Sequence, residues 1–84
     1  MEDSLIIKVL KEIEESGAEG VSFLELLEKL LDKNKPENWI KLRVILTALV
    51  EDMLIEERHG LDGDEKRVDY SINQKGIEFL EKLK

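Results

Sequence analysis

The feature that most constrains the fold lies near the C-terminus, where two short alternating segments flank a turn-forming sequence. In residues 67–72 apolar side chains occupy every second position, which is the pattern of a half-buried strand. Residues 54–58 are a suitable partner strand. The segment 60–64 between them is rich in Gly and Asp, which tolerate the positive φ angles of a turn. We therefore predict a β-hairpin with a long, charged tip.

Three helices are predicted before this hairpin, and the first two are indicated by apolar residues at helical spacing. The first runs from about residue 3 to residue 16, and Gly17 suits a left-handed C-terminal cap. The second starts at a capping box in which Ser22 is the N-cap and Glu25 reaches back from the third helical position. Val21, just before this cap, could form a one-bridge strand.

Two further helices complete the order of elements. The third spans about residues 36–52 with Pro36 in its first turn, where the missing N–H costs nothing. The fourth spans residues 74–84 and is capped by Asn73. The order is helix, short strand, helix, helix, strand, strand, helix, which predicts an α+β fold in a single domain of residues 1–84.

Composition excludes several classes of function. The chain has 84 residues, no cysteine and a net charge of −7, so disulfides and thiolate metal sites are excluded and a general nucleic-acid coat is disfavoured. No apolar run is long enough for a membrane helix, and we expect a cytoplasmic protein. His59 is the only histidine and the glycines fall singly, so we expect no enzyme activity, metal or cofactor.

Two segments carry a resemblance to a known family. Residues 51–58 (EDMLIEER) resemble the exit of helix 3 in winged-helix regulators, and residues 70–80 (YSINQKGIEFL) are similar to the exit of their wing. The resemblance is strongest to the MarR/PadR-like group and to small archaeal winged-helix proteins. It implies a winged helix-turn-helix fold of three helices, a β-hairpin wing and a C-terminal helix. Met53 stands where the family usually has glycine, so we expect this turn to differ or to be strained.

The resemblance also implies a transcriptional regulator that reads duplex DNA with helix 3 (about 36–52) and the wing (about 55–72). Between residues 33 and 44 four bases stand against one acid, and the alternative interpretation is that they are ordinary solvated surface residues. Acids at the hairpin tip would repel phosphate. The expected DNA contacts are Lys35, Asn38, Lys41 and Arg43 of helix 3, and Arg58, Lys66 and Arg67 of the wing.

A second hypothesis is a winged-helix module that binds another protein. Trp39, Ile40, Val44 and Val50 are expected on the outer face of helix 3, where the family has polar residues. Trp39 could be an interface anchor or a core residue. We take DNA binding as the first hypothesis and the protein-binding module as the alternative.

We further expect a homodimer, because a single module with this charge gains little affinity for DNA. Its interface would come from the terminal helices, whose apolar residues exceed what one small core can bury. The expected interface residues are Leu5 and Ile7 of the first helix and Phe79, with Leu83, of the last.

Overall fold

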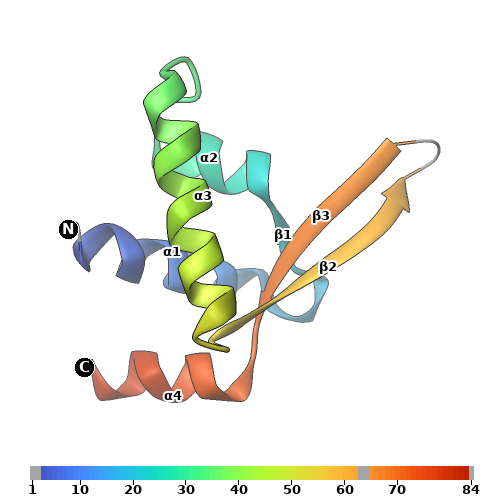
Figure 1. The fold of residues 1–84 in the computed structure, drawn as a ribbon. Coiled ribbons are helices and arrows are strands. Elements are labelled where there is room, and N and C mark those ends of the chain that lie inside the picture. The colour runs from blue at the N-terminus through green and yellow to red at the C-terminus, as the bar shows by residue number, and fades with distance from the viewer. Residues whose placement is uncertain (1–2, 63–64, 84) are drawn as a thin grey trace.

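The computed structural model describes residues 3–62 and 65–83 (Figure 1). In chain order, the elements are α1 (Asp3–Ser16), η1 (Gly17–Glu19), β1 (Val21–Ser22), α2 (Phe23–Leu30), α3 (Pro36–Glu51), β2 (Ile55–Asp62), β3 (Glu65–Ile72) and α4 (Gln74–Lys82). This confirms the predicted α+β class. The four helices pack together at one side, and the β2–β3 hairpin extends away from them (Figure 1).

The predicted helix ends are confirmed where a local hydrogen bond or backbone angle defines them. The Ser22 hydroxyl accepts a hydrogen bond from the Glu25 N–H at 3.2 Å. The side-chain oxygen of Asn73 accepts one from the Gly76 N–H at 2.9 Å. Gly17 has a φ of 63° after α1. Each of these signals acts within a few residues, which is why the sequence alone reveals them.

The sheet has three antiparallel strands in the order β1-β3-β2. The central strand β3 pairs Tyr70 with Val21 of β1 on one side and with Glu57 of β2 on the other. The one-bridge strand expected at Val21 is therefore present, with Ser22 as its second residue. Because β1 precedes α2 directly, this pairing ties the base of the hairpin to the helices.

The core lies between the helices and the base of the hairpin. It contains residues from each of the four α-helices, including Leu10, Leu26, Leu46 and Leu80, and it includes Tyr70 of β3. Leu5 belongs to the same core. The expectation that one small core leaves Leu5 uncovered for a dimer interface is therefore wrong, because the first turn of α1 packs inward.

The turn between α3 and β2 is strained, as expected at Met53. Met53 has a φ of 62°, in the left-handed region that costs a side chain steric energy. Its N–H donates to the Val50 carbonyl, and the Leu54 N–H donates to the Leu49 carbonyl, both at 3.0 Å. These two bonds form a Schellman motif, in which the left-handed position is usually glycine.

Helix α4 starts directly against this turn. A Cβ atom at Gly76 would overlap the Leu54 carbonyl oxygen and would lie 2.7 Å from Cγ1 of Ile72. The side-chain N–H of Asn73 donates to the Met53 carbonyl at 2.6 Å. Gly76 is therefore required by the close approach of the backbones, and Asn73 holds both the cap of α4 and the turn after α3.

Candidate binding surface on helix α3 and the hairpin

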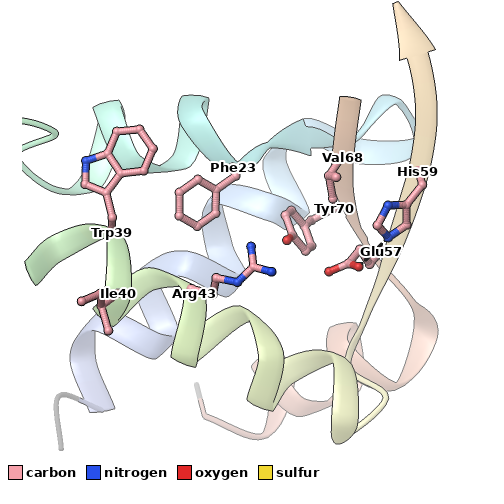
Figure 2. A pocket seen from close by; sticks show the side chains of 8 residues that line it. All are labelled: Phe23, Trp39, Ile40, Arg43, Glu57, His59, Val68 and Tyr70. Atoms are coloured by element: carbon pink, nitrogen blue, oxygen red, sulfur yellow. Dashed lines mark hydrogen bonds and ion pairs between the residues drawn. The ribbon is translucent and has the colours of Figure 1, made fainter. Parts of the chain in front are cut away.

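A groove opens between α3 and the β2–β3 hairpin. It contains a cavity of about 400 Å³, which is within the usual range for ligand pockets. Its lining residues are Phe23 of α2, Trp39, Ile40 and Arg43 of α3, Glu57 and His59 of β2, and Val68 and Tyr70 of β3 (Figure 2). We call this hollow the α3–hairpin groove.

The register of the hairpin explains which side chains reach the groove. Glu57 pairs with Tyr70 and His59 pairs with Val68. Since residues two apart on a strand share a face, all four point to the same side of the hairpin. That side faces α3, and Figure 2 shows the guanidinium of Arg43 extending from α3 toward Tyr70.

Trp39 is held in one position but remains partly open to solvent. Its ring lies 5.8 Å from that of Phe23 between centroids, with 44° between the planes. Its indole N–H donates to the Lys33 carbonyl at 2.7 Å. The residue is nevertheless 42% exposed. Trp39 thus combines both expectations, since it packs against the helices and also presents apolar surface to the groove.

The outward side of α3 is apolar next to the groove. Ile40 is 68% exposed and Val44 is 57% exposed, as expected. Val50 instead lies half-buried against the core, so its expected place on the outer face is wrong. Ile40 and Val44 are one helical turn apart and therefore form a ridge along α3.

The polar residues of the groove form one connected cluster. The Glu57 carboxylate lies 2.6 Å from Nε2 of His59 and also accepts a hydrogen bond from the Tyr70 hydroxyl. Burial, the Glu57 charge and this hydrogen bond raise the pKa of Tyr70 to about 12, while Arg43 opposes the shift. Tyr70 is therefore a neutral donor at ordinary pH, and the Glu57 carboxylate is held in place by two partners.

A second, more open hollow continues the groove toward the C-terminal end of α3. It has a volume of about 590 Å³ and is lined by Val50, Met53, Ile55, Glu56, Glu57 and Asn73. Glu57 lines both hollows, so they adjoin. Met53 is 67% exposed here. We call the two hollows together the trough beside α3; its lining includes Trp39 at one end and Met53 at the other.

Three of the four residues of α3 and its N-terminal cap that are expected to contact DNA have exposed side chains, and the fourth is engaged within the protein. Lys35, Lys41 and Arg43 are exposed. The side-chain amide of Asn38, in contrast, donates to the Asp32 carbonyl at 3.0 Å, so it supports the loop before α3. Arg43 lines the groove, whereas Lys35 and Lys41 are not among the lining residues.

The two arginines of the hairpin that are expected to contact DNA lie on its other face. Arg58 alternates with Glu57 and His59 along β2, so it points away from the groove. Its guanidinium donates to the Ala18 carbonyl at 2.8 Å. Arg67 contacts Asp69 at 2.9 Å and Glu25 at 3.5 Å. The side chains of Lys66 and of the acidic tip residues Asp62, Asp64 and Glu65 lie outside those that the structure describes.

Of the other expected interface residues, Ile7 is half-buried and Phe79 and Leu83 are exposed. Sequence reasoning missed the contribution of Phe23, Glu57, His59, Val68 and Tyr70 to one groove. The alternation of β2 and β3 indicated which of these share a face. What it could not supply was the position of α3 opposite that face.

No known protein family, curated protein or solved structure matches this chain. No helix in the described ranges has the length and apolar character needed to cross a membrane. Within the same ranges, no three side chains of His, Cys, Asp or Glu are grouped so that they could hold a metal ion. What the chain binds therefore has to be inferred from the chemistry of the groove.

Proposed function

We propose that the protein is a protein-binding module that holds an apolar segment of a partner protein in the α3–hairpin groove. The observation that carries this proposal is the exposure of Ile40 and Val44, at 68% and 57%, beside a groove with apolar walls. Adjoining exposed apolar residues of this kind mark interaction surfaces, because burying them contributes about 25 cal/mol per Å².

Trp39 supports the same proposal. It is the only tryptophan, and its ring is already fixed by Phe23 and by the Lys33 carbonyl. A side chain that is ordered before binding loses little entropy when a partner covers it, and tryptophan is enriched among residues that dominate binding energy.

The order of elements supports a winged-helix scaffold for this module. Three helices precede a β-hairpin and a fourth helix follows it. Within the segment 70–80, which resembles the wing exit of winged-helix regulators, Tyr70 is buried, Asn73 caps α4 and Gly76 permits the close approach of α4. In that scaffold α3 and the hairpin form the contact face, and here this face is largely apolar.

DNA binding by a transcriptional regulator is the second candidate, favoured by one specific observation. Lys35, Lys41 and Arg43 are exposed at the start of α3, and the first turns of such a helix enter the major groove in helix-turn-helix proteins. Against it stand the net charge of −7 and the internal contacts of the hairpin arginines. A regulator of this kind would pair as a homodimer, for which Phe79 and Leu83 of α4 offer exposed apolar surface.

A selection experiment tests the proposal. A library of random peptides is selected on the immobilised protein and, in parallel, on the double variant Ile40→Asp, Val44→Asp. A matched control carries Leu24→Asp and Leu83→Asp, which add the same charge at exposed apolar sites outside the groove.

We expect the wild type and the control to enrich the same apolar peptides and the groove variant to lose them. Mixed-sequence duplex DNA should not shift in a gel at low salt. Peptides that are enriched equally on the groove variant would contradict the proposal. Duplex binding that weakens steeply with salt would favour the second candidate.

A further inference from the structure

We infer that the segment held in the α3–hairpin groove is an amphipathic helix whose apolar stripe is flanked by Lys and Arg. This inference rests on the proposed function and names the partner's chemistry. Its first part concerns shape. Trp39 and Met53 mark the ends of the trough beside α3. At a helical rise of roughly 1.5 Å per residue, the positions of these two residues are about 20 Å apart along the axis of α3.

A second helix fits this trough because of the ridge on α3. Ile40 and Val44 are four residues apart, which is the spacing of the ridges that pack into the grooves of a neighbouring helix. An amphipathic helix lying in an apolar groove presents residues at matching intervals, about every third or fourth position. The length of the trough accommodates about four turns of such a helix.

The charge of the partner follows from the end of the trough near Met53. The sequence from residue 51 to residue 57 carries four carboxylates and no base. Glu56 and Glu57 line the hollow there. Glu51 and Asp52 lie in the sequence between its lining residues Val50 and Met53. The segment at this end of the groove therefore carries a concentrated negative charge, of which Glu56 and Glu57 line the hollow itself.

The local structure leaves most of this charge unbalanced. Glu51, Asp52 and Glu56 are exposed and form no ion pair with the described residues. The last turn of α3 carries no basic residue, so the negative end of the helix dipole adds to the carboxylates. Only Glu57 is engaged, by His59 and Tyr70.

A cationic partner complements both the local and the overall charge. With a net charge of −7, the protein attracts Lys- and Arg-rich segments over a distance and repels acidic ones. Because Lys35, Lys41 and Arg43 lie toward the other end of α3, the partner's basic residues should be concentrated at the end that reaches Met53. DNA phosphates crossing from α3 to the hairpin would instead meet this acidic end and be repelled.

The test uses three synthetic peptides of about 18 residues, or five helical turns. All carry leucine at helical spacing and no tryptophan. One has lysine flanks, one has glutamate flanks, and one has lysine flanks with two central prolines that break the helix. Trp39, as the only tryptophan, reports binding directly through its fluorescence.

Two double variants isolate the acidic end. Glu51→Lys with Glu56→Lys reverses its charge, whereas Glu14→Lys with Glu15→Lys makes the same change in net charge on exposed positions of α1. We expect the lysine peptide to bind the wild type at least about tenfold more tightly than the other two. The Glu51/Glu56 variant should lose about tenfold for this peptide and the α1 variant much less, with smaller differences at high salt.

The outcomes separate the inference from the proposed function. Equal affinities for the lysine and glutamate peptides would overturn the cationic partner but leave the groove as a protein-binding site, provided that Ile40→Asp with Val44→Asp abolishes binding. Equal affinity for the proline-containing peptide would overturn the helical partner. Affinities that are unchanged by Ile40→Asp with Val44→Asp would overturn both proposals.

Discussion

The left-handed conformation of Met53 predicts that glycine at this position gives a more stable protein than alanine, which is the reverse of the usual order of stability. Met53 has a φ of 62°, and a non-glycine residue in this region costs about 1–2 kcal/mol. Glycine at this position removes that cost. It also lowers the free energy of unfolding by about 0.4–1 kcal/mol, because the unfolded chain with glycine has more conformational entropy to lose on folding. Met53→Gly and Met53→Ala both remove the side-chain atoms beyond Cβ. The stability lost with the partial burial of those atoms is therefore the same in both variants and cancels when they are compared. We therefore expect Met53→Gly to be more stable than Met53→Ala by about 1 kcal/mol.

The assay is reversible unfolding in urea, followed by circular dichroism, for both variants. Ala48→Gly serves as the matched control, because Ala48 is exposed within the regular helix α3. There glycine should lower the free energy of unfolding by about 1 kcal/mol. In thermal unfolding, each difference corresponds to about 4–8 °C for a domain of this size. A Met53→Ala variant as stable as Met53→Gly, or more stable, would refute the claim that this turn is strained.

The same residue connects strain with binding. Met53 is 67% exposed and lines the hollow near the acidic end of the groove. Residues in costly conformations tend to persist where the side chain has a use. We expect Met53→Gly to bind the lysine-flanked peptide more weakly than the wild type even though the turn is relaxed. Unchanged affinity would show that the trough ends before Met53.

Three further predictions concern the packing around α4 and the groove. Gly76→Ala should destabilise the protein by about 2 kcal/mol in urea unfolding, because the added Cβ overpacks the site. Gly60→Ala is the control, since a Cβ at that position would have no neighbour within 4 Å. It should show no comparable loss of stability from a steric clash. Asn73→Ala removes the cap of α4 and should cost about 1 kcal/mol in the same assay; a loss no larger than at an exposed helix position would contradict the capping role. The pKa of Tyr70 is raised from 10.0 to about 12, so its contribution to stability is complete below about pH 10 and is lost as the pH rises toward 12. Between pH 9 and pH 11 the wild type should therefore lose more unfolding free energy than Tyr70→Phe, and equal losses would contradict the shift.

Features set by neighbouring residues could be predicted from the sequence. The caps at Ser22 and Asn73, the left-handed Gly17 and the alternation in β3 each depend on interactions within a few positions of the chain. The strain at Met53 was also predictable, because the winged-helix pattern that residues 51–58 resemble usually has glycine there. These signals were sufficient for the order of the elements and for the α+β class.

The candidate site depended on contacts between distant parts of the chain. The hydrogen bond from Arg58 to the Ala18 carbonyl joins residues 40 positions apart, and nothing near Arg58 in the sequence indicates it. The same holds for the contact between Arg67 and Glu25. Leu5 was misplaced because the helical stripe of α1 could not show how deeply its first turn packs. Charge counts along the sequence therefore do not show that the two hairpin arginines also make contacts within the protein.

The most direct test of the central claim is one titration of isotopically labelled protein, followed by two-dimensional ¹H–¹⁵N NMR. The lysine-flanked peptide and a mixed-sequence duplex are added in separate series at the same low salt. A protein-binding groove predicts that the peptide shifts the amides of Ile40, Val44 and Met53 and the indole N–H of Trp39, while the duplex shifts none of them. Saturable shifts of the α3 amides with the duplex, and none with the peptide, would contradict the account.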